Sequence, residues 1–321
     1  MKDWPSTCLN WLGRCRWALA GTLCLLVLSC GTGIEVTEHV TNKDVQRAIG
    51  QVDSRQAPVT LDAYQDSLPA WKRGKRFWVA DDQVTQILAI AVAYDKDTLH
   101  LAGHILSYAG YSISGPFENR RVYVDFDDME TGLRLVYRYG KAADAYHAGS
   151  SLPMLIDLDM VEHVARQLVD KEFFIRTPIW YDRNTEQMID GRHFIKVYID
   201  SVLPGNAVLP LRVLFTTTDT REQAMVWMNN NASTMIGRDF DALFSAVNPR
   251  ESFPAITDAN WERITRGQVT EGMTKEECRL ALGSPKRINE RPDQSGMREY
   301  WYYDGGSYLY FVDGLLHQFR K

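Results

Sequence analysis

A dense series of helix-end and turn signals in the C-terminal part of the chain constrains its fold more than any other feature. Thr274 followed by Glu277 is the pattern of a capping box, in which the hydroxyl and the carboxylate satisfy the first free amides of a helix. Gly283 suits the left-handed position that ends a helix, and Pro285 prevents continuation. Asp313-Gly314 between apolar runs is a strong signal for a two-residue hairpin. The pattern predicts a helix ending near Gly283 and antiparallel strands after it.

A second helix is expected just before this one. Thr257 or Asp258 can cap it, and Gly267 can end it. Gly305-Gly306 permits a reversal between the first two of three expected strands. Residues 257–321 are therefore expected to form a small unit of two helices and three strands.

These residues resemble the BamE family, also called SmpA/OmlA, of outer-membrane assembly lipoproteins. The resemblance implies a two-helix, three-strand sandwich, a lipid anchor and a scaffolding role beside the β-barrel assembly machine. Family members are little more than this module, whereas here a long region precedes it, so the chain as a whole is similar to multi-unit envelope lipoproteins of Bacteroides-type bacteria. The matching positions are Gly272, Met273, Thr274, Lys275, Glu277, Leu282, Gly283, Pro285, Trp301, Tyr303, Phe311, Gly314 and Leu315.

The aromatic residues of the expected strands are the candidate partner-binding residues. Side chains alternate between the two faces of a strand, so Tyr300 and Tyr302 share one face while Trp301 and Tyr303 share the other. One face must cover the helices, and the other can be a contact patch, since Tyr and Trp are enriched at binding hot spots. The sequence leaves open which face is which. The candidates are Tyr300, Trp301, Tyr302, Tyr303, Tyr308 and Tyr310.

The N-terminus has the features of an export signal. Basic residues precede an apolar run from Trp17 to Leu28, which is shorter than the ~20 residues that a membrane-spanning helix needs. Val27-Leu28-Ser29-Cys30 resembles a bacterial lipobox, which implies removal of residues 1–29 and acylation of Cys30 with palmitate-type chains. An ordinary cleaved signal and an uncleaved anchor are the alternatives. No Asp follows Cys30, so the expected location is the periplasmic face of the outer membrane.

Cysteine use and charge narrow the function classes. Of the five cysteines, only Cys278 lies after Cys30, so no disulfide is expected within the exported chain, and Cys278 is expected to be a small buried hydrophobe. The net charge is −5 and no basic run occurs, which argues against nucleic acid as a partner.

The middle of the chain alternates β-branched and aromatic runs with polar turns, which is typical of β-strands. Three pairs of segments match in order: 75–79 with 171–175, 122–125 with 197–200, and 133–137 with 211–215. The matches predict two related small β-units, for which an SH3-like barrel is one candidate. The expected class is α+β: tether and short helices over 30–75, a first β-unit over 76–156, a helix and second β-unit over 157–235, a helix and linker over 236–256, and the BamE-like unit over 257–321.

Two rival functions follow from the middle region. The β-units could bind cell-wall or glycan fragments in a cleft lined by Trp78, Trp180 and Tyr181. A hydrolase would need a convergent Ser, His and Asp pocket, and the sequence shows no nucleophile elbow, phosphate loop or dinucleotide fingerprint. The favoured reading is a non-catalytic scaffold without a cofactor.

The spacing of the acidic and histidine residues does not favour a metal site. Asp125, Asp127, Asp128 and Glu130 crowd one turn but lack the spacing of an EF-hand, which favours a solvated turn. His100 and His104 are expected on a strand, out of register for a shared zinc ion.

Overall fold

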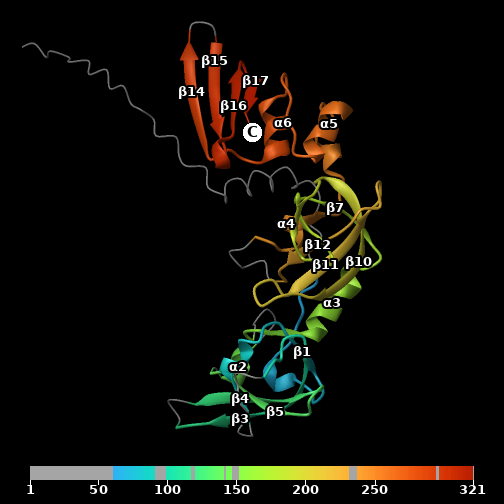
Figure 1. Ribbon diagram of the computed structural model, residues 1–321, viewed down its shortest axis with the longest axis vertical. Helices are drawn as coiled ribbons and strands as arrows, with labels where there is room; N and C mark the ends of the chain where they lie inside the picture. Colours follow the sequence, from blue (N-terminus) through green and yellow to red (C-terminus); the bar gives the residue numbers. More distant parts are fainter. Residues whose placement is uncertain are drawn as a thin grey trace, which may run out of the picture. The chain divides into compact units, whose positions relative to one another are not determined.

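The computed structural model describes residues 61–90, 99–116, 120–140, 142–146, 152–230, 237–293 and 296–320. The expected signal segment, Cys30 and residues 31–60 of the expected tether and short helices lie outside these ranges. The described residues form an α+β structure of three antiparallel sheets with few helices, coloured in chain order in Figure 1. Within the described ranges, no helix has the length and apolar character needed to cross a membrane.

The first sheet has the strand order β2-β5-β4-β3-β1-β6. Its core contains Phe77, Phe126 and Tyr137, all nearly inaccessible to solvent. The elements are η1 (Leu68–Ala70), β1 (Arg76–Val79), α2 (Val84–Ile87), β2 (Leu88–Ile90), β3 (Ile105–Ser114), β4 (Arg121–Asp128), β5 (Arg134–Arg138), η4 (Ala143–Ala145) and β6 (Leu155–Asp157).

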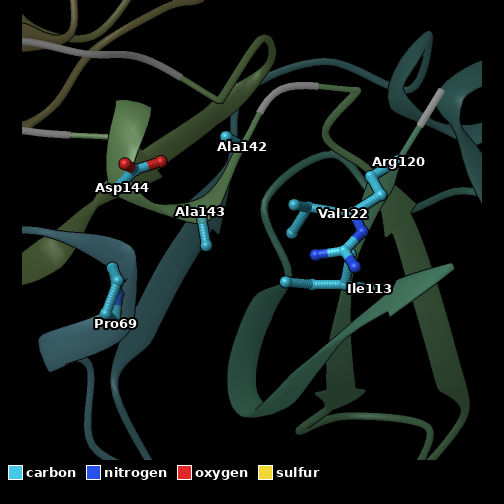
Figure 2. A pocket seen from close by; sticks show the side chains of 7 residues that line it. All are labelled: Pro69, Ile113, Arg120, Val122, Ala142, Ala143 and Asp144. Atoms are coloured by element: carbon cyan, nitrogen blue, oxygen red, sulfur yellow. The ribbon is translucent and has the colours of Figure 1, made fainter. Parts of the chain in front are cut away.

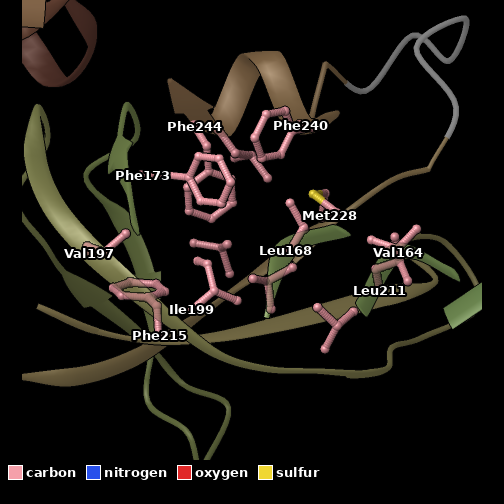
Figure 3. Close-up of a cluster of buried hydrophobic side chains, with 14 of the residues drawn as sticks. Val164, Leu168, Phe173, Val197, Ile199, Leu211, Phe215, Met228, Phe240 and Phe244 are labelled. Carbon is pink, nitrogen blue, oxygen red and sulfur yellow. The ribbon is translucent and has the colours of Figure 1, made fainter. Parts of the chain in front are cut away.

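The second sheet has the order β13-β7-β10-β11-β12-β8-β9 and curls into a half-barrel around its core. Helix α3 (Leu158–Leu168) supplies Val164 and Leu168 to this core, and the short helix α4 brings Phe240 over Phe173 (Figure 3). The other elements are β7 (Glu172–Ile175), β8 (Ile179–Tyr181), β9 (Met188–Asp190), β10 (Ile195–Pro204), β11 (Leu211–Thr217), β12 (Gln223–Met228), α4 (Phe240–Leu243), β13 (Phe244–Ser245) and η5 (Pro249–Ser252).

The two sheets share one strand order. Read from β9, the second sheet places β8, β12, β11, β10, β7 and β13 where the first places β2, β5, β4, β3, β1 and β6. The equivalent strands β3 and β10 both carry a bulge, after Tyr108 and Ile199 respectively. The expected match of 75–79 with 171–175 pairs the equivalent strands β1 and β7 and is therefore right. The match of 122–125 with 197–200 pairs β4 with β10, which is equivalent to β3. The match of 133–137 with 211–215 pairs β5 with β11, which is equivalent to β4, so both of these matches are wrong by one strand.

The C-terminal unit consists of two helices and one sheet of order β14-β15-β16-β17. Its core joins Ile264 of α5 and Cys278 of α6 to Trp301 and Phe311 of the sheet. The sheet face toward α5 and α6 is called the inner face below. The elements are α5 (Asp258–Thr265), α6 (Lys275–Leu282), β14 (Arg287–Asp293), β15 (Gly296–Tyr302), η6 (Asp304–Gly306), β16 (Tyr308–Val312) and β17 (Leu315–Arg320).

The predicted helix caps and turns of this unit are confirmed, and the strand number is corrected. Thr257 caps α5, and both hydrogen bonds of the Thr274–Glu277 capping box are present. Asp313 and Gly314 have φ values of 48° and 85° and join β16 to β17. The sheet has four strands and not three, because β14 was not expected. An edge strand tolerates charged residues and proline, so Arg287–Asp293 does not have a strand-like composition.

Two expected helices differ from the structure. Residues 61–66 are irregular and only Leu68–Ala70 form a 3₁₀ turn, because the Asp66 carboxylate accepts from the backbone of Ser67 and the indole of Trp71. The helix expected within 236–256 covers only Phe240–Leu243, since Phe244 and Ser245 pair with β7 instead.

Candidate functional site

Alternation along β15 and β16 places four tyrosines on the outer face of the C-terminal sheet. The inner positions Trp301, Leu309 and Phe311 are at most 2% exposed. The residues between them are half-buried and face away from the helices. These residues, Tyr300, Tyr302, Tyr308 and Tyr310, are called the tyrosine face.

The strand register orders the outer face into three rows that cross all four strands. Residues directly opposite each other in antiparallel strands lie on the same face, and strands are ~4.8 Å apart, so each row is ~14 Å long. The first row is Arg287, Tyr302, Tyr308 and Arg320; the second is Asn289, Tyr300, Tyr310 and Gln318; the third is Arg291, Arg298, Val312 and Leu315.

The aromatic rings of the tyrosine face contact one another and a cation. Tyr300 and Tyr310 are stacked with their ring centroids 4.6 Å apart and their planes at 27°. The guanidinium carbon of Arg287 lies 4.6 Å from the centroid of the Tyr302 ring. His317, in the bulge of β17, meets Tyr310 edge-on at 5.9 Å. Offset stacking and cation–π contact hold large rings at fixed positions on the surface, as a binding surface requires.

The charged members of the three rows have one sign. The basic members of the three rows are all arginines, and no side chain described there is a carboxylate. The buried carboxylate of Glu299 lies on the inner face, where it accepts from Lys275 and from the indole nitrogen of Trp301. Anionic groups are therefore favoured on the outer face.

Two of the six sequence candidates do not belong to the tyrosine face. Trp301 is fully buried in the core of the unit. Tyr303 packs against the same core, burial raises the pKa of its phenol, and its hydroxyl donates to the carbonyl of Gly283 at 3.2 Å. The sheet face that covers the helices is therefore the face that carries Trp301.

The residues proposed to line a glycan cleft occupy different environments. Trp180 is 0% exposed, stacks edge-on against Phe215 and donates its indole N–H to the carbonyl of Thr177. Trp78 packs partly buried against the core of the second sheet. Tyr181 faces the other side of β8, where it contacts Trp227 and the guanidinium of Arg238. Because the Trp180 indole is enclosed by the core, it cannot line a cleft that is open to a ligand.

A hollow of about 310 Å³ lies in the first unit (Figure 2). This volume is at the lower end of the range for small-ligand sites. Its walls are mostly apolar, with Arg120 and Asp144 on opposite sides of it. The lining residues are Pro69, Ile113, Arg120, Val122, Ala142, Ala143 and Asp144. One basic and one acidic side chain do not make a convergent catalytic set.

The acidic and histidine residues considered for metals have separate partners. His104 lies between Asp128 (3.1 Å) and Glu130 (3.3 Å), while His100 lies 3.0 Å from Asp82; both histidines are in the loop before β3 and not in the expected strand. Burial of Asp128 alone would raise its pKa, but hydrogen bonds from Thr131, His104 and the Glu130 amide outweigh this and lower it. Among the described residues, no group of three potential ligands converges on one point.

A cluster of buried charges around Lys75 was not predicted from the sequence. The Lys75 ammonium lies 2.8 Å from Asp157, 2.8 Å from Asp159 and 3.2 Å from Asp66. Burial by itself would lower the pKa of Lys75, but the charge and hydrogen bonds of the aspartates outweigh it and raise the pKa. A lysine held in its charged form cannot act as a base or nucleophile. The contacts bring together residues far apart in the sequence, so no local pattern could have indicated them.

The outer-face arginines of β14 were also missed, because β14 itself was not predicted. The only sequence signal is the alternation of Arg287, Asn289 and Arg291 with Ile288 and Glu290.

No protein-family model, curated protein or solved structure matches this chain.

Proposed function

We propose that this chain is a non-catalytic, lipid-anchored scaffold on the periplasmic face of the outer membrane. The lipobox-like sequence ending at Cys30 supports the anchor. Several acyl chains hold a protein stably on a bilayer, whereas one chain binds only weakly. The protein would work by holding other envelope proteins close to the membrane.

The tyrosine face is the observation that carries this proposal. It presents four half-buried tyrosines in a two-by-two block with arginines at both ends of the first row. Tyr and Arg are the residues most often found at the energetic centre of protein interfaces. Rings that are already stacked lose little conformational freedom when a partner binds.

We infer that the C-terminal unit is BamE-like and that the scaffold acts beside the β-barrel assembly machine. The capping box, the Gly283 helix end and the Asp313-Gly314 hairpin support it, and the fourth strand β14 is a difference from the expected pattern. The partners on this reading are subunits of the β-barrel assembly machine.

The two preceding β-units would be spacers built as SH3-like barrels. The shared order, in which β6, β1, β3, β4 and β5 follow one another across the sheet, supports this, as does the short 3₁₀ helix η4 before the last strand. The strand equivalent to β6 in the second unit also follows a short helix, α4.

In-cell photocrosslinking tests the scaffold proposal. The photoreactive residue p-benzoylphenylalanine would replace Tyr310 on the tyrosine face or, as the control, Glu262 on the exposed side of α5. We expect discrete crosslinked envelope proteins, including barrel-assembly subunits, from Tyr310 and not from Glu262. Equal crosslinking from both positions, or from neither, would contradict a binding role for this face.

Fractionation tests the anchor separately. In the native bacterium, a palmitate analogue should label the wild-type chain and place it in the outer-membrane fraction. Cys30→Ser should lose the label and leave that fraction. A wild-type chain without acyl groups in the soluble fraction would refute the anchor.

A further inference from the structure

We propose that the tyrosine face binds an acidic, extended segment of a partner protein. This inference rests on the proposed function, because it names the partner chemistry of the same surface. It starts from a contrast in charge: the chain carries a net charge of −5, yet the three rows of the outer face contain four arginines and no described carboxylate.

The guanidinium groups on this face have N–H donors that can bind a carboxylate. Within the described part of the chain, Arg287, Arg291 and Arg320 form no ion pair. Arg287 is already oriented over the Tyr302 ring, with its guanidinium at the surface. A guanidinium binds a carboxylate through two parallel N–H donors, and such charge-assisted hydrogen bonds are roughly twice as strong as neutral ones.

The spacing of the rows suits an extended chain. Arg287 and Arg320 lie at the two ends of one row, ~14 Å apart across four strands, with the tyrosines between them. An extended segment rises ~3.3 Å per residue, so acidic side chains about four residues apart can reach both arginines. The side chains between them would lie on the tyrosine rings, and Asn289 and Gln318 at the ends of the second row can bind the backbone.

The composition of the face favours a protein segment over an anionic membrane. Surfaces that bind membranes combine basic residues with Trp, Phe or Leu side chains that insert among the lipids. Here the centre is tyrosine, and the only exposed large aliphatic residue in the three rows is Leu315 at one corner. The basic positions are arginines, which are enriched at protein interfaces where lysine is depleted.

Fluorescence anisotropy with the full chain in mild detergent tests the inference. The probe is a labelled peptide of about eight residues with Glu at its second and sixth positions, Phe at its fourth and Ser between them, so that the two carboxylates and the ring point to the same side of the extended chain. The comparison probes are the Lys and Phe version of the peptide, glycerol phosphate as the soluble headgroup of an anionic lipid, and a single-stranded oligonucleotide. We expect the acidic peptide to bind, with weaker binding at high salt because the contacts are electrostatic.

Matched charge variants locate the binding. Arg287→Gln with Arg320→Gln should weaken binding of the acidic peptide by about tenfold or more, since each lost charge-assisted contact is worth roughly a factor of ten. Arg263→Gln with Arg266→Gln removes the same charge from α5 and should leave the affinity unchanged. An unchanged melting temperature establishes that each variant is folded.

The outcomes separate this inference from the proposed function. If Tyr300→Ser with Tyr308→Ser abolishes partner crosslinking from position 310 while the Arg287 and Arg320 variant binds the acidic peptide normally, the acidic partner is wrong and the scaffold surface stands. If neither pair of substitutions affects crosslinking or peptide binding, both are wrong. Binding of glycerol phosphate, the oligonucleotide or the Lys peptide in preference to the Glu peptide also overturns the acidic segment.

Discussion

Cys278 lies at the centre of the C-terminal core, where α6 meets the sheet. It is 0% exposed, and burial raises the pKa of its thiol to about 12. The thiolate is the reactive form of cysteine, so this thiol should be inert while the unit is folded. The expectation of a buried hydrophobe is confirmed at this residue.

A thiol-reactive probe should therefore report unfolding of the C-terminal unit. In a variant with Ser at positions 8, 15, 24 and 30, Cys278 should not react with Ellman's reagent in buffer and should react fully in denaturant. The result would be contradicted by rapid labelling of the native protein. A folded control with an added surface cysteine, Glu262→Cys, should label at once.

His193 should make stability depend on pH. It is 3% exposed; its Nε2 lies 2.9 Å from the carbonyl of Leu280, while Nδ1 is buried and has no hydrogen-bond partner among the described residues. Burial lowers the pKa of His193, and the hydrogen bond to Leu280 offsets this only in part. The unfolded chain takes up the proton near pH ~6.5 and the folded chain only at lower pH, so this contribution to stability is present above that value and is lost as pH falls.

Denaturant unfolding of His193→Gln across pH 5 to 7.5 measures this effect. The fall in the free energy of unfolding toward low pH should be smaller in the variant than in wild type, by at most ~1.4 kcal/mol per pH unit for one proton. The exposed His317→Gln is the matched control. Parallel pH curves for wild type and His193→Gln would show that the histidine does not contribute.

At the scale of elements, the capping box of α6 does more than begin one helix. Glu277 accepts from the Thr274 amide at 2.7 Å and, with its other oxygen, from the Asn260 side chain of α5 at 2.7 Å. The box therefore connects the two helices that cover the sheet.

Thr274→Ala should lower the free energy of unfolding by about 1 kcal/mol, the usual effect of losing an N-cap. Thr274→Ser keeps the hydroxyl that accepts from the Glu277 amide and should stay close to wild type. Urea unfolding of the two variants compares them directly. An equal loss in both would mean that the threonine methyl group, and not the cap, is what stabilises the helix.

Elements that carry their own start and stop signals could be predicted, and those fixed by tertiary contacts could not. Helix α3 lies at the start of the segment 157–235, where a helix was expected before the second β-unit. The strand expected to carry His100 and His104 begins only at Ile105, because the Asp82 carboxylate accepts from the amides of Leu101 and Ala102 and holds a turn there. Periodicity fixed the alternation of the tyrosines, but only the position of the helices decides which face is exposed.

At the scale of the molecule, the two β-units share an architecture that the sequence indicated only in outline. The segment 122–125 resembles 197–200 because amphipathic strands of the same unit alternate in the same way, whichever place they take in the sheet. Strand order depends on pairing across long sequence separations, so the existence of a repeat was easier to detect than its alignment.

Lys75 lies where the first unit, the preceding segment and helix α3 come together. Its ammonium contacts Asp66 of the segment before β1 and both Asp157 and Asp159 at the start of α3, whose apolar side packs in the core of the second sheet. Asp157 is itself buried, and it caps α3 through the Asp159 amide at 2.9 Å. One buried cation thus contacts three carboxylates from two parts of the chain.

Lys75→Met should destabilise the protein by about 3–5 kcal/mol, because it leaves a buried carboxylate without its partner. The neighbouring Arg76→Gln removes a charge from a half-exposed ion pair with Glu162 and should cost at most ~1 kcal/mol. Denaturant unfolding at neutral pH measures both variants. A Lys75→Met variant as stable as Arg76→Gln would show that the buried cluster does not hold these elements together, whereas adding Asp157→Asn to Lys75→Met should recover part of the loss because it removes the unpaired charge.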